Sequence, residues 1–333
     1  ALGLLRLLAD ALLLDFEFAA RLAIRLLWVA TAWGAWQLAA DVVRRSPRPD
    51  GAASSEAATR GRRATIAGAL AFVFVALSPA GLAFSGTLFL EVPCAFLAVF
   101  ALRAWLRRDP LEAVASRAAR RDLVFGCWLA ALVFAKWNYG LLFLAAFLLD
   151  AFVRSLVGPR ATGARGALVG LSRALMPLAV TAAWWFLWPW PGGWEHAASH
   201  RASFAAYLGS NLEHGRTAPA MKLLLLCVSF APSARLLPLV AAGAALAASE
   251  VRASAAVRTL FVATLAVGGP VLVHDFFLDR FLLPPGVVLW VLAAVGLSRL
   301  AAGGRGVLRP VILALVVAAC LPFAARDARA AGG

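Results

Sequence analysis

The stretch RAWLRRDPLEAVASRAARRDLVFGCWLAALVFAKWNYG, residues 103–140, contains the pattern that decides the fold. An arginine-rich tract comes first, an apolar run follows, and the turn after that run holds no arginine and one lysine, Lys136. The same alternation recurs along the chain. If the apolar runs cross a membrane back and forth, every arginine-rich tract falls on the same side.

The two kinds of connection differ consistently in composition. The arginine-rich tracts hold most of the 32 Lys and Arg residues, at 44–63, 103–121, 154–173, 252–258 and 299–309. The turns on the other side are short of arginine and hold all four histidines, at 85–91, 136–140, 190–222 and 274–280. Because cytoplasmic loops carry an excess of Lys and Arg, the asymmetry predicts a polytopic membrane protein and its orientation. Polar chemistry then gathers on the non-cytoplasmic face.

Composition agrees with this class. A chain of 333 residues that is 62% hydrophobic and 15% charged is not an ordinary soluble domain. A span needs roughly 20 apolar residues. About ten segments qualify: 22–43, 64–84, 88–106, 123–135, 141–153, 174–190, 221–249, 259–273, 281–298 and 310–325. We expect an all-α transmembrane bundle forming one domain over 1–333, with short spans at 123–135 and 141–153.

The net charge of +15 is explained by contacts between arginines and anionic membrane lipids. The arginines are spread over five predicted cytoplasmic loops, where they anchor helix ends against anionic lipid. No basic stripe interleaved with aromatics is present for a nucleic acid to follow. We therefore expect membrane lipids, and no nucleic acid, as partners. The four cysteines lie in predicted spans without metal or disulfide spacing.

Two segments outside the spans have distinct patterns. Residues 1–20 carry leucines at helical spacing between charged residues, which predicts an amphipathic helix in the outer interface. Residues 191–222 form one moderate external loop. The predicted orientation puts Ala1 on the outer side, so we expect a leading span and loop ahead of it. In the loop, His196 and His200 would share a helix face, but zinc needs a third ligand, and acceptor or lipid contacts are favoured.

Glu91 is the first candidate for chemistry, in SGTLFLEVP at 85–93. It is a carboxylate at the outer end of an otherwise apolar helix, and Pro93 suits the first turn of that helix. Helix N-termini favour an anion. The alternative is an interfacial glutamate in contact with headgroup water, at a helix end wet enough to tolerate either protonation form.

Lys136 is the second candidate, in FAKWNYG at 134–140. It lies between two apolar runs beside Trp137 and Tyr139. One interpretation is a lysine that extends to the surface through an aromatic belt. The other is a cation that binds phosphate next to an aromatic surface for a sugar or lipid.

The third candidate is HDFFLDRFLLP, residues 274–284. It places His274, Asp275, Asp279 and Arg280 between two apolar spans. Ionisable groups this dense at a membrane boundary favour a functional role over a simple loop.

Taken together, these stretches resemble the membrane glycosyltransferases that use polyprenyl-phosphate sugars, of the GT-C type. These include the protein O-mannosyltransferases and the bacterial aminoarabinose transferases that act on lipid A. In this family a Ser-Pro step and an outer turn lead to an acidic residue and a proline, as in SPAGLAFSGTLFLEVPCAF. A lysine turn between short helices matches GCWLAALVFAKWNYGLLFL, and an Arg-aromatic pair before an apolar helix matches HDFFLDRFLLPPGVVLW.

The resemblance covers roughly residues 5–300, and its order and sidedness are more specific than any single motif. It places the family's first span and first external loop, which normally carries the catalytic carboxylate, before Ala1. It implies sugar transfer from a polyprenyl-phosphate donor to a lipid, glycan or protein acceptor on the periplasmic face of a bacterial inner membrane.

Within this chain the resemblance implies three kinds of residue. Glu91 stands at the family's acidic position and is the catalytic residue expected within this chain, where it orients the acceptor or assists the base, and Tyr139, Asp275 and Asp279 contact the acceptor or sugar. The donor phosphate is bound by a set of cationic side chains, Lys136, Arg280 and His274. No motif identifies a metal site or cofactor, and a divalent-cation requirement stays open.

Two other functions compete with this prediction. A secondary transporter would place ionisable residues near the bilayer midplane on interrupted helices, often with inverted repeats. Here the charges gather at outer helix ends, and the chain has no convincing repeat. A noncatalytic membrane assembly protein is the third alternative. The sugar, the acceptor and the anomeric outcome are not encoded in any motif.

Overall fold

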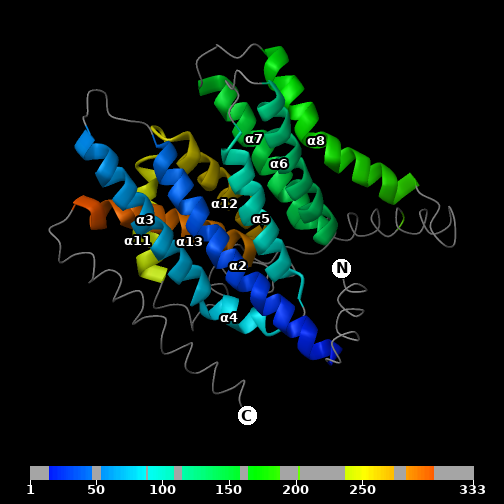
Figure 1. Cartoon of the computed structure of the whole chain (residues 1–333), viewed down its shortest axis with the longest axis horizontal. Helices are drawn as coiled ribbons and strands as arrows, with labels where there is room; N and C mark the ends of the chain where they lie inside the picture. Colours follow the sequence, from blue (N-terminus) through cyan, green and yellow to red (C-terminus); the bar gives the residue numbers. More distant parts are fainter. Residues whose placement is uncertain are drawn as a thin grey trace.

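The structure is a computed structural model that describes residues 15–46, 54–87, 89–108, 115–157, 164–187, 202, 237–273 and 283–303. These residues form a bundle of helices and include no β-strand, as predicted (Figure 1). The helices are α2 (Phe16–Arg45), α3 (Ser54–Ala76), α4 (Pro79–Ser85), α5 (Glu91–Leu106), α6 (Ala115–Ala135), α7 (Trp137–Val157), α8 (Ala164–Leu187), α11 (Leu237–Ala248), α12 (Ala255–Val273) and α13 (Leu283–Gly303).

Helix α2 differs from the predicted boundary. Asp15 caps it by accepting a hydrogen bond from the Phe18 amide at 2.9 Å, and the helix then runs unbroken for 30 residues. We expected an interfacial helix to end near residue 20 and a span to begin at 22. Arg21 and Arg25 lie on exposed faces, so they interrupt the apolar pattern without ending the helix. Residues 1–14 of the predicted interfacial helix lie outside the described residues.

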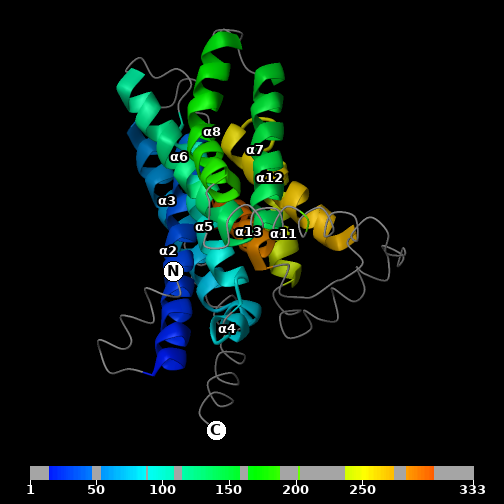
Figure 2. The same ribbon diagram turned by 90° about the vertical axis from the view of Figure 1, so that its right-hand side faces the viewer.

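The predicted span 64–84 is broken in two. Helix α3 ends at Ala76, and α4 starts at Pro79, where a proline costs no hydrogen bond. Ser78 caps α4, since its hydroxyl accepts a hydrogen bond from the Gly81 amide at 3.0 Å. Figure 2 shows α4 at one end of the bundle, opposite the end where α7 leads into α8.

The two spans predicted to be short are longer than expected. Helices α6 and α7 have 21 residues each, against about 13 in the prediction. The additional length lies largely at the arginine-rich ends. Asp122, just before the predicted start of the first of these spans, pairs with Arg108 at 2.7 Å. This pairing lets a helix continue through charged residues that a hydropathy pattern excludes.

The number of spans stays a prediction. Among the described residues, three helices are long and apolar enough to cross a membrane by length and composition: Phe16–Arg45, Trp137–Arg154 and Leu283–Leu300. Shorter apolar helices cover Val169–Trp184 and Ala255–Pro270. The predicted span at 310–325, the external loop at 191–222 (except Ala202) and most of the predicted span 221–249 lie outside the described part of the chain.

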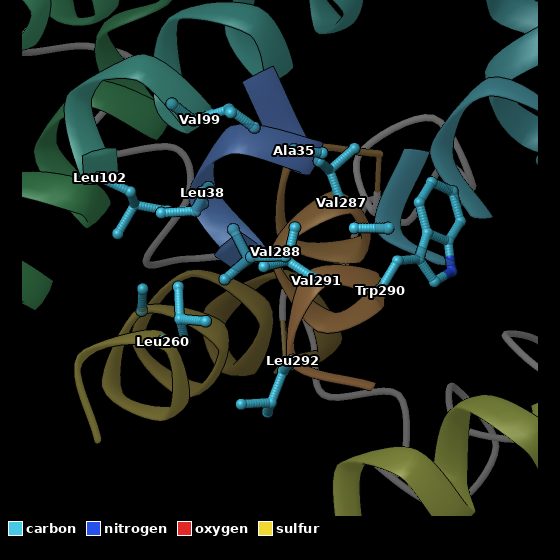
Figure 3. Packing of buried hydrophobic residues seen from close by; sticks show 14 of the residues in the cluster. Ala35, Leu38, Val99, Leu102, Leu260, Val287, Val288, Trp290, Val291 and Leu292 are labelled. Carbon is cyan, nitrogen blue, oxygen red and sulfur yellow. The ribbon is translucent and has the colours of Figure 1, made fainter. Parts of the chain in front are cut away.

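The core lies where α2, α5, α12 and α13 meet. Leu38, Leu102, Leu260 and Val288 are fully buried there and point toward one another (Figure 3). Small residues bring helices close together elsewhere. A Cβ on Gly296 would lie 1.9 Å from the Gly243 carbonyl oxygen, so α11 and α13 cross with their backbones nearly in contact. Such small-residue crossings are typical of helices that pack in membranes.

Charged side chains join the arginine-rich helix ends. We call this set of contacts the arginine layer; it comprises Asp41 with Arg103 and Arg107, Arg63 and Arg299 with Glu250, Arg108 with Asp122, and Arg154 with Asp150. Except for Asp150–Arg154, which lies within α7, the pairs join the C-terminal ends of α2, α5 and α13 and the turn after α11 to one another and to the N-terminal halves of α3 and α6. Helices that alternate in direction therefore bring all these ends to one side of the bundle, as the threading predicts.

Asymmetric labelling tests which compartment that side faces. In a cysteine-free background, cysteines at Ser54 and Ala115 should be shielded from a membrane-impermeant thiol reagent in intact cells. A cysteine at Ser203 should be labelled, because the positive-inside pattern puts it outside. Labelling of the first two with protection of the third would reverse the orientation.

Candidate functional site

Glu91 is the first residue of α5, at the end of the bundle opposite the arginine layer. Leu90 precedes it at the N-cap and gives no side-chain cap, so the first turn has amides to satisfy. A carboxylate in that turn is stabilised by the positive end of the helix dipole. Only 2% of Glu91 is exposed. This burial rules out the alternative of a glutamate that faces headgroup water.

Lys136 lies at the tip of a helical hairpin. Helix α6 ends at Ala135 and α7 begins at Trp137, so Lys136 alone joins them. Phe125 and Phe147 lie at similar distances before and after this tip, and their ring centroids are 4.9 Å apart. This contact shows that the two helices run antiparallel, and Lys136 therefore lies with Glu91 at the end of the bundle opposite the arginine layer.

Gly140 makes this tight reversal feasible. A Cβ at Gly140 would lie 2.3 Å from the Val133 Cα, closer than any real Cβ contact. The backbones of α6 and α7 therefore touch one turn from the tip. This close spacing positions Lys136, so Gly140 is a structural determinant of the site. Gly140 is part of the motif FAKWNYG, but the motif alone does not predict that the glycine is needed for helix packing.

The two candidates form a buried ion pair. The Lys136 Nζ donates to the Glu91 Oε1 at 2.6 Å, across 45 positions of sequence. The Glu91 side chain is 2% exposed and the Lys136 side chain is 21% exposed. Removing one partner of such a pair typically costs about 3–5 kcal/mol, since it leaves an uncompensated buried charge. In this pair the Glu91 carboxylate is inaccessible to solvent, whereas the Lys136 side chain is partly accessible.

Two further side chains enclose the pair. The Tyr139 ring centroid lies 5.2 Å from the Lys136 Nζ, a cation–π distance, and Tyr139 is only 2% exposed. Cys94 is fully buried one turn after Glu91. The Tyr139 ring thus supports the lysine from within the bundle, and its contact with a sugar or acceptor stays a prediction.

The Arg21 side chain forms a hydrogen bond with the turn that leads to Glu91, and no sequence pattern predicted this contact. Its Nη1 donates to the Gly86 carbonyl at 3.0 Å, and its Nη2 lies 2.6 Å from the Glu17 Oε1. Arg21 is a charged residue within an apolar run, and such a residue is expected to have a polar partner. Its target, a backbone carbonyl, has no sequence signal.

The other predicted site residues lie outside the described part of the chain. His274, Asp275, Asp279 and Arg280 fall between the end of α12 at Val273 and the start of α13 at Leu283. The structure brings Glu91, Lys136 and Tyr139 together and leaves the remaining roles as predictions. In the part of the chain that is described, no group of three or more His, Cys, Asp or Glu residues could hold a metal ion.

Solved structures share this fold. ArnT from Cupriavidus metallidurans in the apo state is similar over 84% of this chain and 45% of that protein, with a TM-score of 0.55 and 19% identity. ArnT bound to undecaprenyl phosphate is similar over 87% of this chain and 48% of that protein, with a TM-score of 0.53 and 14% identity. This chain spans just under half the length of those proteins. No family model matches the sequence, and no curated protein matches it.

The chain therefore shares its fold with ArnT, a fold of the kind that the sequence resemblance predicted.

A glycine pair tests how the hairpin positions Lys136. Gly140→Ala should destabilise the protein by about 1–3 kcal/mol, because the new methyl group meets the Val133 backbone. Gly61→Ala is the matched control, since a Cβ there meets nothing within 4 Å and alanine favours a helix by up to about 1 kcal/mol. Thermal unfolding in lipid nanodiscs measures both. Equal stability of the two variants would contradict the close α6–α7 contact.

Proposed function

We propose that the chain transfers a sugar from a polyprenyl-phosphate donor to an acceptor at the non-cytoplasmic face of a bacterial inner membrane. One observation carries the proposal: the buried Glu91–Lys136 pair at helix ends opposite the arginine layer. The likeness of the fold to an ArnT structure that holds undecaprenyl phosphate supports the class of donor.

The location suits the chemistry of such a donor. The prenyl tail stays in lipid, so its phosphate and sugar lie at the membrane surface. The positive-inside pattern assigns the outer surface to the Glu91 end of the bundle. A cation accessible from that surface, as Lys136 is at 21% exposure, is suited to neutralise phosphate charge.

The reaction needs a proton acceptor and a phosphate-binding cation. An acceptor hydroxyl or amine loses its proton to a carboxylate, and we assign Glu91 to orient the acceptor or to assist that base. The acceptor atom forms a bond to the anomeric carbon as the bond from that carbon to the phosphate oxygen breaks. Polyprenyl phosphate leaves with the electron pair. Cations stabilise the charge developing on this leaving group.

The remaining roles follow from the sequence resemblance. We assign the donor phosphate to Lys136, Arg280 and His274. Sugar or acceptor contacts belong to Tyr139, Asp275 and Asp279, and the acceptor is a lipid, glycan or protein.

Point variants test these roles in a transfer assay with the full-length protein. Lys136→Ala and Arg280→Ala should each reduce kcat/KM for a polyprenyl-phosphate sugar, at a cost of about 2–4 kcal/mol in transition-state stabilisation. Glu91→Gln should lower turnover by roughly 100-fold or more. Its burial in an ion pair also implies a loss of stability, which corrects the expectation of a wet helix end that tolerates either form.

Arg117→Ala is the control, because Arg117 is exposed at the arginine-rich start of α6. This variant should transfer sugar at the unaltered rate. Equal losses in Arg117→Ala, Lys136→Ala and Arg280→Ala would indicate defective insertion and overturn the assignment of the donor site. A well-folded and fully active Glu91→Gln variant would remove Glu91 from the reaction.

A further inference from the structure

The arginine layer contains one set of contacts in which positive charge exceeds negative charge by two. Among the described residues, the other carboxylates of the layer pair with one or two arginines each. Asp41 pairs with three, which are Arg44, Arg103 and Arg107. We call these four side chains the Asp41 cluster. Its excess charge calls for an anion.

The Asp41 carboxylate binds the two arginines of α5 and leaves the third at a distance. Helices α2 and α5 lie side by side, and the Nε atoms of Arg103 and Arg107 each donate to the Asp41 Oδ2 at 3.0 Å (Figure 1). The two guanidinium groups therefore lie beside each other. The Arg44 Nη1 is 3.7 Å from the Asp41 Oδ1, which is too far for a hydrogen bond. Arg44 thus has an ion pair with Asp41 but no hydrogen bond to it.

The helix dipoles neutralise only part of this excess. Arg44 lies in the last turn of α2, Arg103 lies in the last turn of α5, and Arg107 is the C-cap of α5. A helix C-terminus is equivalent to about half a negative charge. Three arginines against one carboxylate and two helix ends leave about one positive charge uncompensated. That charge matches the single negative charge of a phosphodiester.

The guanidinium groups are accessible and have donors to spare. The Arg44 side chain is 62% exposed and the Arg107 side chain is 46% exposed, whereas that of Asp41 is 11% exposed. Each guanidinium has five N–H donors, and Asp41 occupies only part of those of Arg107. Arginine binds phosphate oxygens through two parallel N–H bonds. Arg44 and Arg107 can therefore bind one phosphate between them while Asp41 keeps Arg107 in position.

Aromatic side chains near the cluster favour a lipid over a soluble anion. Phe100 lies two helical turns before Arg107 on the same face of α5, and Trp33 lies three turns before Arg44 on the same face of α2. Trp33 is 49% exposed, and the partly exposed Phe100 ring stacks on Trp128 at 5.1 Å. These separations correspond to about 10 Å and 16 Å along a helix. With the arginines at the level of the headgroups, both rings lie at the depth of the acyl chains.

We propose that the Asp41 cluster is a binding site for one anionic phospholipid. The lipid phosphate bridges Arg44 and Arg107, and an acyl chain lies against Trp33 and Phe100. The bound phosphate neutralises the excess charge where α2 and α5 end, and it thereby stabilises the contact between the two helices. The site lies at the end of the bundle opposite Glu91, and it does not depend on the proposed sugar transfer.

Native mass spectrometry of the full-length protein measures this binding. The probe is phosphatidylglycerol, which carries one negative charge, and the comparison lipid is phosphatidylethanolamine with the same acyl chains, which carries no net charge. The unaltered protein should retain phosphatidylglycerol preferentially. The double variant Arg44→Gln, Arg107→Gln should bind it more weakly, by roughly fivefold for each arginine removed. The melting temperature should then rise less on adding phosphatidylglycerol than it does for the unaltered protein.

The double variant Arg117→Gln, Arg120→Gln is the matched control. It removes the same charge from two exposed positions at the arginine-rich start of α6. It should retain phosphatidylglycerol as the unaltered protein does. Should the loss of the Arg107 hydrogen bond impair folding, Arg44→Gln alone keeps the test valid, because Arg44 makes only an exposed ion pair with Asp41. This single variant should show a loss of roughly fivefold.

Three outcomes would overturn the lipid site. Equal losses in the two double variants would mean that the overall positive charge of this side attracts the lipid, without a defined site. Equal retention of both lipids by the unaltered protein would mean that the cluster is neutralised within the protein. If inorganic phosphate displaces phosphatidylglycerol, or raises the melting temperature as much, the ligand is a soluble anion and not a lipid.

Discussion

A charge inside an apolar bundle must have a partner, and this constraint organises both ends of the structure. At one end, the arginine layer pairs the carboxylates Asp41, Asp122, Asp150 and Glu250 with arginines. The pairs of Asp41 and Glu250 join helices that are far apart in sequence, whereas Asp150 pairs with Arg154 of its own helix. At the other end, Glu91 and Lys136 form the buried pair. At both ends the carboxylate is the more buried partner, and at the Glu91 end its cation is a lysine from the tip of the α6–α7 hairpin.

The antiparallel hairpin of α6 and α7 connects the two ends physically. Trp105 packs against Phe125 and Phe147, and its Nε1 donates to the Asp150 carboxylate at 2.7 Å. Arg154 lies 2.8 Å from the same carboxylate and donates to Thr259 of α12. These contacts fix the hairpin against α5 and α12 near the arginine layer. The hairpin is thereby held as a rigid support that presents Lys136 at its tip, where Gly140 allows the close reversal.

The helical class and the sidedness could be predicted from the sequence, because alternation of apolar runs and arginine tracts reports directly on insertion. Helix ends could not. The hydropathy pattern ends near Asp122, yet α6 starts at Ala115, since pairing with Arg108 makes that charge tolerable. Similarly, Arg21 and Arg25 lie near the predicted break between an interfacial helix and a span. Because both arginines are exposed, α2 continues through them without a break. Local charge is visible in a sequence, but the partner that compensates it is not.

The same limit applies to the site. Motif resemblance placed Glu91 and Lys136 on one face, but no spacing rule brings residues 45 positions apart into a 2.6 Å contact. The burial of Glu91 depends on how α5 packs against α6 and α7, and this packing is a tertiary property. His274, Asp275, Asp279 and Arg280 keep their roles as predictions from the motif that follows α12.

The central claim is that a polyprenyl phosphate meets the bundle at the Glu91–Lys136 end. Photo-crosslinking tests it most directly, with an undecaprenyl phosphate that carries a photoreactive group in its first isoprene unit and with mass spectrometry of the labelled peptides. We expect labels in the peptides that contain residues 89–96 and 134–140, and we expect these labels to be lost on competition with unmodified undecaprenyl phosphate. Labels confined to the arginine layer, around residues 103–122, would contradict it.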